Sequence, residues 1–191
     1  YIMVEILVFG EPRQPVITGP TPMPPYLLPS RSLLLILVAL TALGEISTQL
    51  IIPSLGVIEL IMNARPGSSL LALSAFVAAF GLGQLLLGPL SDRIGRRPVL
   101  VAGLLVYLLA TSWMLLASSM GEFIAARVLQ GLGACAALVL ARAIVRDVWQ
   151  TQAGPALALT VIGMLCAIVL SPMLGGVLTL YGGWRAPIAL A

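Results

Sequence analysis

The sequence contains no histidine and no lysine, and charged residues make up only 9% of its 191 residues. Without histidine, the chain lacks the Ser-His-Asp and Cys-His arrangements of nucleophilic enzymes, and it lacks histidine-based metal sites. Soluble domains carry about 25% charged residues because their surface faces water. This chain has too few polar side chains to cover a soluble particle of its size, so most of it is expected to face lipid.

Cysteine and basic residues are also restricted. The two cysteines, Cys135 and Cys166, lie far apart inside apolar runs and have no CxxC spacing. This pattern predicts two small packing residues, and neither a disulfide framework nor a zinc site. The ten basic residues are all arginines, and they cluster beside hydrophobic runs without forming a basic face. We therefore expect no metal, no cofactor, no nucleic-acid partner and no enzymatic activity.

Long hydrophobic segments fill the rest of the chain. Hydrophobic residues make up 60% of it, and the mean hydropathy is +1.09. A helix of about 20 apolar residues crosses roughly 30 Å of hydrocarbon, and in lipid a helix satisfies its own backbone. The sequence predicts an all-α, polytopic transmembrane bundle with five full spans at 33–53, 69–90, 99–119, 122–145 and 156–181. A sixth segment begins at Trp184 and is too short to span, so we expect the functioning protein to be longer.

Residues 1–32 differ from the bundle predicted for residues 33–191. They are rich in proline, which cannot donate a backbone hydrogen bond and clashes with a preceding helical turn. We expect an irregular tail there, and no cleavable signal peptide, because the apolar run that follows is too long. The chain begins with Tyr, so either Met23 is the natural start or the residues before it do not belong to the natural protein.

Arginine placement predicts the orientation in the membrane. With alternating spans, one side holds only Arg65 and Arg185. The other side holds seven arginines: Arg13, Arg31, Arg93, Arg96, Arg97, Arg142 and Arg146. Arginine accumulates in cytoplasmic loops. The sequence therefore predicts a cytoplasmic N-terminus in the cytoplasmic membrane.

Two charges lie where lipid is expected. Glu45 is in the first segment and Arg127 in the fourth, and burying a charge at mid-helix costs at least ~2.5–3.5 kcal/mol. Counting about 1.5 Å per residue from the outer segment ends places them at roughly 12 and 8 Å depth. We expect the two side chains to share one cavity. They form either a structural ion pair or a proton- or substrate-binding carboxylate tuned by an arginine.

Polar residues accompany both charges. Thr41, Glu45, Thr48 and Gln49 recur at helical spacing and form one polar stripe on an apolar helix, which is typical of a helix that lines a wet cavity. Gln130 and Gly131 follow Arg127 by three and four residues, and we expect them to extend the same cavity wall. The alternative is that these polar side chains hold helices together.

The loop after the second segment runs Gly-Pro-Leu-Ser-Asp-Arg-Ile-Gly-Arg-Arg from Gly88. Gly88 is expected to permit close helix approach, and Gly95 a tight turn. Asp92 is a lone acid that can pair with a cation or a helix N-terminus. The simplest interpretation is a basic membrane anchor with one incidental acid among its arginines: Arg93, Arg96 and Arg97.

This loop resembles the signature loop of the major facilitator superfamily, with the pattern G-x-L-[SA]-D-R-x-G-R-[RK], and every fixed position is filled. The stretch that begins at Arg127 resembles that superfamily's fourth-helix motif R-x-x-Q-G-x-G-A, which is associated there with proton transfer. The stretch that begins at Ser171 resembles the end of its fifth-helix antiporter motif, and it keeps three fixed residues: Pro172, Gly175 and Gly176.

The likeness extends to one group within the superfamily. Residues 84–92 and 141–147 are similar to the bicyclomycin- and chloramphenicol-resistance (Bcr/CflA-type) exporters. The sequence departs from the family pattern at Glu45, where Asp is common. It also departs in the fifth-helix motif, where three glycines are replaced: Ala158, Ala167 and Ser171.

The resemblance implies the N-terminal half of a major-facilitator transporter, built from two inverted three-helix repeats, with the C-terminal half missing from this chain. It implies proton-coupled efflux of small hydrophobic compounds or antibiotics, so the expected partners are a small-molecule substrate, protons and the bilayer. Glu45 would bind proton and substrate in turn, with Arg127 tuning it. Asp92 and the loop arginines would latch the cytoplasmic side, together with Arg142 or Arg146.

Other interpretations remain open. Pro172, Gly175 and Gly176 give a kinked, thin helix surface, which lets two helices slide or seal, or which simply packs closely. The same fold serves uniporters and importers of small metabolites. The chain can also be an inactive, truncated helical membrane protein.

Overall fold

The computed structural model describes residues 31–150 and 153–191, and its described part is helical. The helices in chain order are α2 (Arg31–Ile51), the 3-10 turn η2 (Ile52–Ser54), α3 (Leu55–Ile61), α4 (Ser68–Ile94), α5 (Arg96–Leu116), α6 (Met120–Trp149), α7 (Ala153–Gly182) and α8 (Arg185–Leu190). The predicted proline-rich tail and Arg13 lie outside the described residues.

Five helical stretches are long and apolar enough to cross a membrane. This confirms the predicted all-α class and the five full spans. The first span differs from its predicted end at Pro53, because η2 and α3 carry the helical path on to Ile61. Pro53 is tolerated there because it occupies the first turn of η2, where a backbone N–H has no helical partner to lose.

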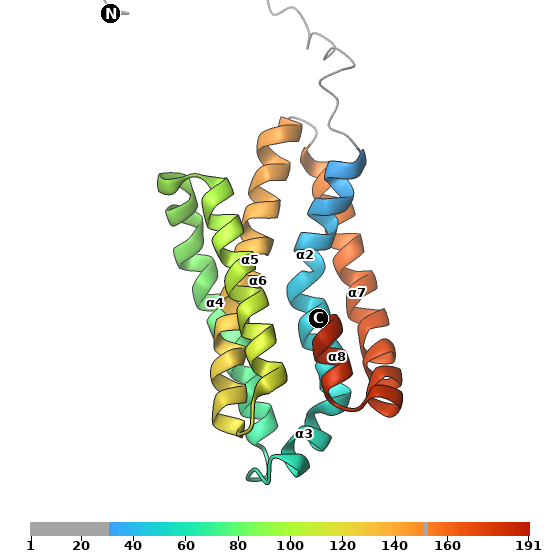
Figure 1. The fold of residues 1–191 in the computed structure, drawn as a ribbon. Helices are drawn as coiled ribbons and strands as arrows, with labels where there is room; N and C mark the ends of the chain where they lie inside the picture. The colour runs from blue at the N-terminus through green and yellow to red at the C-terminus, as the bar shows by residue number, and fades with distance from the viewer. Residues whose placement is uncertain (1–30, 151–152) are drawn as a thin grey trace, which may run out of the picture.

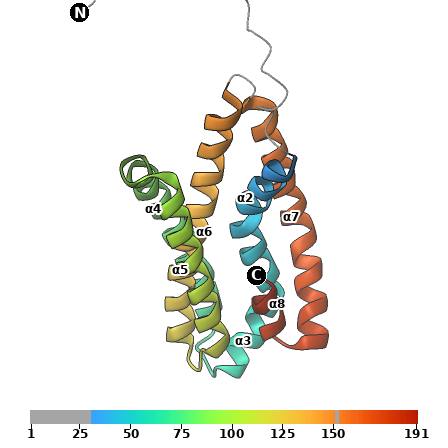
Figure 2. The same cartoon turned by 45° about the horizontal axis from the view of Figure 1, so that its top comes forward.

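Four helices form a layer, and two further helices, α5 and α8, cover one of its faces (Figure 1). α6 packs along α4, α5 and α2, and α2 in turn packs along α7. Figures 1 and 2 show α4 and α5 on one side of α6, and α2 with α7 on the other. α5 and the short α8 lie on the near side in Figure 1, so the order α4, α6, α2, α7 makes up the far layer.

Small residues let α6 occupy the centre. A Cβ added at Gly131 would lie 2.5 Å from the Phe76 carbonyl oxygen of α4. One added at Gly133 would lie 2.6 Å from the backbone nitrogen of Tyr107 on α5. Helix association in lipid depends on such close packing, because lipid tails are as apolar as the side chains. The prediction that Gly131 forms part of a cavity wall is therefore wrong, because this glycine packs against α4.

The helix ends are set by turn and cap residues. Gly95 has φ +103° between α4 and α5, and its N–H donates to the Ser91 carbonyl, which confirms the predicted tight turn. At the start of α6, the Ser119 hydroxyl accepts from the Glu122 N–H, while the Glu122 carboxylate accepts from the Ser118 N–H. This reciprocal cap satisfies backbone donors that the helix itself leaves free.

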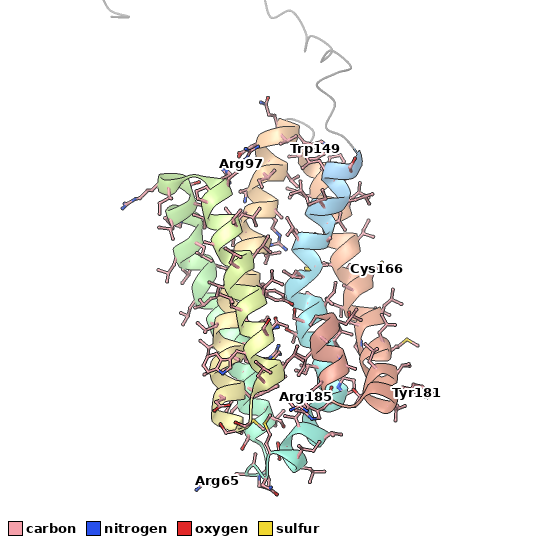
Figure 3. The ribbon with its side chains drawn as sticks, in the orientation of Figure 1. Arg65, Arg97, Trp149, Cys166, Tyr181 and Arg185 are labelled. Carbon is pink, nitrogen blue, oxygen red and sulfur yellow. The ribbon has the colours of Figure 1, made fainter. Side chains whose placement is uncertain are left out.

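The alternation of spans separates the arginines. Figure 3 shows Arg97 and Trp149 at one end of the bundle, and Arg65 with Arg185 toward the other. We call these the Arg97 end and the Arg65 end. Gly88, which was expected to permit close helix approach, has open space where its Cβ would be. That expectation is wrong because the C-terminal part of α4 borders a small cavity, and no neighbouring helix lies close to Gly88 there.

Candidate functional site

Arg127 is completely buried near the Arg65 end of α6. One terminal nitrogen donates to the Gln130 Oε1 at 2.7 Å, and the guanidinium carbon lies 4.5 Å from the centroid of the Phe76 ring on α4. The aromatic face attracts the cation, and such a contact gains strength away from water. Arg127 is thus held between α6 and α4.

The hydrogen bonding of Arg127 is incomplete. Its Nε and its second terminal nitrogen have no hydrogen-bond partner among the described residues. Its measured contacts are with Gln130 and Phe76, and no ion pair joins it to Glu45 in the part of the chain that the structure describes. The structural ion pair, one of the two interpretations of these charges, is therefore not found among the described residues. The estimate of similar depths for Glu45 and Arg127 also fails, because it was counted from Pro53, whereas the first span continues to Ile61.

Glu45 lies on the opposite side of α2 from Ser47 and α5. Ser47 points back toward α5, where it contacts Tyr107, and residues two apart on a helix face about 200° apart. Glu45 is half-buried, and it has no hydrogen bond or ion pair with any described residue. Its carboxylate thus belongs to the far face of the layer, which α5 and α8 leave uncovered (Figure 1).

The rest of the polar stripe lies on that same side of α2. Thr48 and Gln49 are half-buried, whereas Thr41 is buried at 3% exposure. Both threonine hydroxyls donate to backbone carbonyls of their own helix, Thr41 to Val38 and Thr48 to Gly44. Among the described residues, the stripe therefore presents the Glu45 carboxylate and the Gln49 amide without hydrogen-bond partners, beside two hydroxyls that bond their own backbone.

Gln130, predicted to line the cavity, is fully buried, at 0% exposure. Its amide nitrogen donates to the Thr111 hydroxyl on α5 at 2.8 Å, and that hydroxyl donates to the Tyr107 carbonyl at 2.9 Å. Gln130 therefore joins Arg127 to α5 and does not face open space.

Tyr107, Thr111 and Ser47 are polar residues of this region that the sequence pattern did not identify. The Tyr107 hydroxyl contacts the Ser47 hydroxyl of α2 and the Ala191 carbonyl, and the Ser47 hydroxyl lies 2.8 Å from the Leu43 carbonyl, so two hydroxyl protons are shared among three contacts. Tyr107 is 3% exposed and Ser47 1%. A hydroxyl in an apolar segment commonly bonds its own backbone, so sequence spacing carries no signal for a contact between helices.

The predicted gating loop centres on Arg96. Its Nε lies 2.7 Å from Asp147 of α6, and a terminal nitrogen lies 3.8 Å from Asp92. Among the described residues, the Asp92 carboxylate pairs with Arg96 and with neither Arg142 nor Arg146. Arg146 donates to the Arg142 carbonyl of its own helix. A polar cavity of about 220 Å³ lies beside the pair and includes Gly88. Arg93 and Arg97 are exposed.

The fifth-helix motif meets α2 at one point. A Cβ added at Gly175 would overlap the Leu50 carbonyl oxygen, whereas one at Gly176 would meet nothing within 4 Å. One turn further on, the Thr179 hydroxyl lies 3.1 Å from the Ser54 hydroxyl. Pro172 lies inside α7, which continues through it. The close contact in this motif is therefore made by Gly175.

The two cysteines have different environments. Cys135 is buried against Gly83 of α4, as expected for a small packing residue. Cys166 is exposed on α7, so the packing expectation is wrong for it, because that face of α7 has no neighbouring helix in the described bundle (Figure 3). No group of three or more acidic or cysteine side chains suited to a metal ion occurs within the described ranges.

An apolar groove of about 620 Å³ lies apart from Glu45 and the polar stripe of α2. It opens between α4 and α5 over α6, and Leu86, Ala102 and Leu129 are among the residues that line it. Glu45 and the polar stripe do not contribute to its walls. The groove is therefore separate from the candidate site on α2.

Comparison with known proteins supplies the family. The family model of the Major Facilitator Superfamily matches residues 34–191. Multidrug resistance protein D of Escherichia coli K12 is 37% identical over 156 residues, 81% of this chain and 40% of that protein. The chloramphenicol resistance protein of Pseudomonas aeruginosa is 35% identical over 149 residues, 77% of this chain and 36% of that protein.

Multidrug resistance protein MdtM of Salmonella typhimurium LT2 is 37% identical over 143 residues, which are 73% of this chain and 34% of that protein. The chain therefore spans about two fifths or less of the length of these curated relatives.

Proposed function

The chain belongs to the major facilitator superfamily of membrane transporters, and from that premise we propose that it forms the first half of a proton-coupled exporter of small hydrophobic compounds. The chain is a multi-pass membrane protein and is related to drug-resistance proteins. It spans about two fifths or less of the length of those relatives, which supports a second half in the complete transporter. We propose that this half covers the far face of the layer.

The observation that carries the proposal is the half-buried, unpartnered carboxylate of Glu45. A charge inside a membrane span is costly, so such residues line ion or substrate pathways. Glu45 would bind a proton when the cavity opens to one side, and a substrate would displace that proton when it opens to the other. Alternate occupation of one carboxylate gives exchange.

Arg127 would favour the charged form of Glu45 from a distance, because its buried cation has no acidic partner among the described residues. Gln130 would hold the guanidinium in place. Thr48 and Gln49 would contact the substrate beside Glu45, and Thr41 would continue the same face.

The Arg96 pair would help to close the Arg97 end. Arg96 lies between two acids from different helices, so a shift of α4 against α6 must break or remake one contact. These side chains are partly exposed, and exposed pairs contribute about 0–1 kcal/mol each. A latch of this strength would be easily reversible, as a transport cycle needs. We place this end, and the N-terminus with it, in the cytoplasm.

Transport by the protein expressed from its complete gene tests this function. Cells loaded with chloramphenicol, the compound in one relative's name, are expected to export it, and a protonophore is expected to stop the export. Glu45→Gln should abolish export because an amide cannot exchange a proton. Glu45→Asp should retain part of it, and Glu59→Gln, in the same span but at the Arg65 end, should retain nearly all.

The same assay separates the alternatives. Export that persists in Glu45→Gln would remove this carboxylate from the mechanism and favour a uniporter or importer. No transport of any tested compound by the complete protein would favour an inactive helical membrane protein.

A further inference from the structure

Glu45 and Arg127 do not touch, yet the proposed exchange needs them to respond to each other. The described residues supply one polar route between their helices. Arg127 bonds Gln130, Gln130 bonds Thr111, and Thr111 lies one turn from Tyr107 on α5, whose hydroxyl contacts Ser47 of α2. Ser47 is two residues from Glu45, on the opposite side of the same helix.

We infer that Tyr107 is a positioning residue for Glu45. Its hydroxyl holds the back of α2 against α5, the helix that bonds Gln130 through Thr111, and so sets how far the Glu45 carboxylate turns into the uncovered face. This inference deepens the proposed function and rests on it for its biological meaning. Tyr107 itself touches neither proton nor substrate in this role.

Burial makes the contact decisive for the position of α2. Tyr107 and Ser47 are almost fully buried, so water does not compete for the contact between their hydroxyls, and each hydroxyl has a second partner, the Ala191 carbonyl for Tyr107 and the Leu43 carbonyl for Ser47. Around these hydroxyls, α2 meets α6 and α4 through apolar or small residues such as Leu43 and Gly44. Apolar contacts tolerate rotation of a helix, whereas a hydrogen bond has a direction.

Apart from Arg127, the charged residues on the helices around α2 lie near helix ends or contact other groups, so Arg127 is the cation that we expect to act on Glu45. α7, which packs along α2, contains no charged residue. α8 contributes Arg185, whose guanidinium donates to the Leu115 carbonyl and lies over the Trp184 ring. The remaining charges of α6 are near its ends: Glu122, Arg142, Arg146 and Asp147. The titratable groups of α7 are on its outer side in Figure 3: Cys166 and Tyr181.

Carbodiimide labelling tests the inference without a known substrate. Dicyclohexylcarbodiimide reacts with protonated carboxyl groups in apolar surroundings, and mass spectrometry of the purified full-length protein reports Glu45 and Glu59 in one sample. Tyr107→Phe removes one hydroxyl and keeps the ring. We expect it to raise the labelling rate of Glu45 roughly two- to tenfold, the factor that a single hydrogen bond supplies, and to leave Glu59 unchanged.

The controls separate positioning from general loosening. Tyr181→Phe, at a tyrosine that is 90% exposed on α7, should change nothing. Ser47→Ala removes the contact with α2 and leaves Tyr107 its Ala191 partner, so it should raise the Glu45 rate as Tyr107→Phe does. The double variant should add nothing further, and Ser47→Thr should keep the original rate because it keeps the hydroxyl. All variants should keep the Tm of the unaltered protein to within the change seen for Tyr181→Phe.

Three results would overturn the inference: an unchanged or lower Glu45 rate in Tyr107→Phe, additive effects in the double variant, or an equal rise at Glu59. Failure of the proposed function gives a different result, namely export that survives Glu45→Gln. The labelling outcome does not depend on that assay.

Discussion

Burying the Arg127 guanidinium costs free energy that its neighbours recover only in part. Gln130 and Phe76 occupy one nitrogen and one face, and two nitrogens stay without hydrogen-bond partners among the described residues. Removing one partner of a buried charge is far more damaging than replacing the whole group by an apolar one. Arg127 is therefore better explained by transport than by stability.

Two substitutions test this at the residue scale. Arg127→Met is expected to leave the Tm of the purified protein unchanged or higher, because an apolar side chain of similar length replaces a poorly paired charge. Gln130→Leu is expected to destabilise the protein by about 1–3 kcal/mol when Arg127 is present. In the Arg127→Met background its effect should be smaller. Thermal unfolding of the four proteins in detergent measures this, and a large loss from Arg127→Met would contradict it.

At the scale of elements, the crossing of α2 and α7 depends on one glycine. Gly175 brings its backbone against the Leu50 carbonyl, and the hydroxyl pair of Ser54 and Thr179 continues the contact. Neighbouring Gly176 faces open space. The two glycines look equivalent in the sequence motif. The register between α2 and α7 is what distinguishes them.

Alanine at these two positions gives a matched comparison. Gly175→Ala should destabilise the bundle by about 1–3 kcal/mol, because its methyl group overlaps the backbone of α2. Gly176→Ala should be neutral or stabilise by up to about 1 kcal/mol, the difference in helix propensity. The Tm of each purified variant tests this. Equal losses at both positions would show that α7 does not pack on α2 in this register.

At the scale of the whole molecule, the bundle is asymmetric in the placement of its charges and in which of its faces other helices cover. Loop arginines gather at the Arg97 end, while Arg65 and Arg185 lie toward the other. One face of the layer is covered by α5 and α8 (Figure 1). The half-buried Glu45 is assigned to the other face, because Ser47 on the opposite side of α2 contacts α5. The first asymmetry predicts the orientation in the membrane, and the second predicts where the proposed second half docks.

Reporter fusions check the orientation. Alkaline phosphatase, which folds only outside the cytoplasm, should be active when fused after Asn63 and inactive when fused after Arg97. A green fluorescent protein fused at the same points should show the reverse pattern, since it fluoresces when it folds in the cytoplasm. A fluorescent fusion after Asn63 would place the Arg97 end outside and overturn the assignment.

The sequence by itself determined the spans, the family and the two charged residues inside the spans. Lipid imposes a minimum apolar length, and a charge in such a segment stands out without any knowledge of its neighbours. Segment ends were predicted to within a few residues, except at Pro53, where a short 3-10 turn continued the helical path.

Only the tertiary structure decided which side chains meet. Glu45 and Arg127 form no ion pair among the described residues, Arg96 pairs with Asp147 of α6, and Tyr107 contacts Ser47, which lies sixty residues away in the sequence. In lipid, every apolar side chain has an acceptable environment, so hydropathy does not specify how helices rotate about their axes. Small-residue contacts and a few buried hydrogen bonds set those rotations, and both depend on the facing helix.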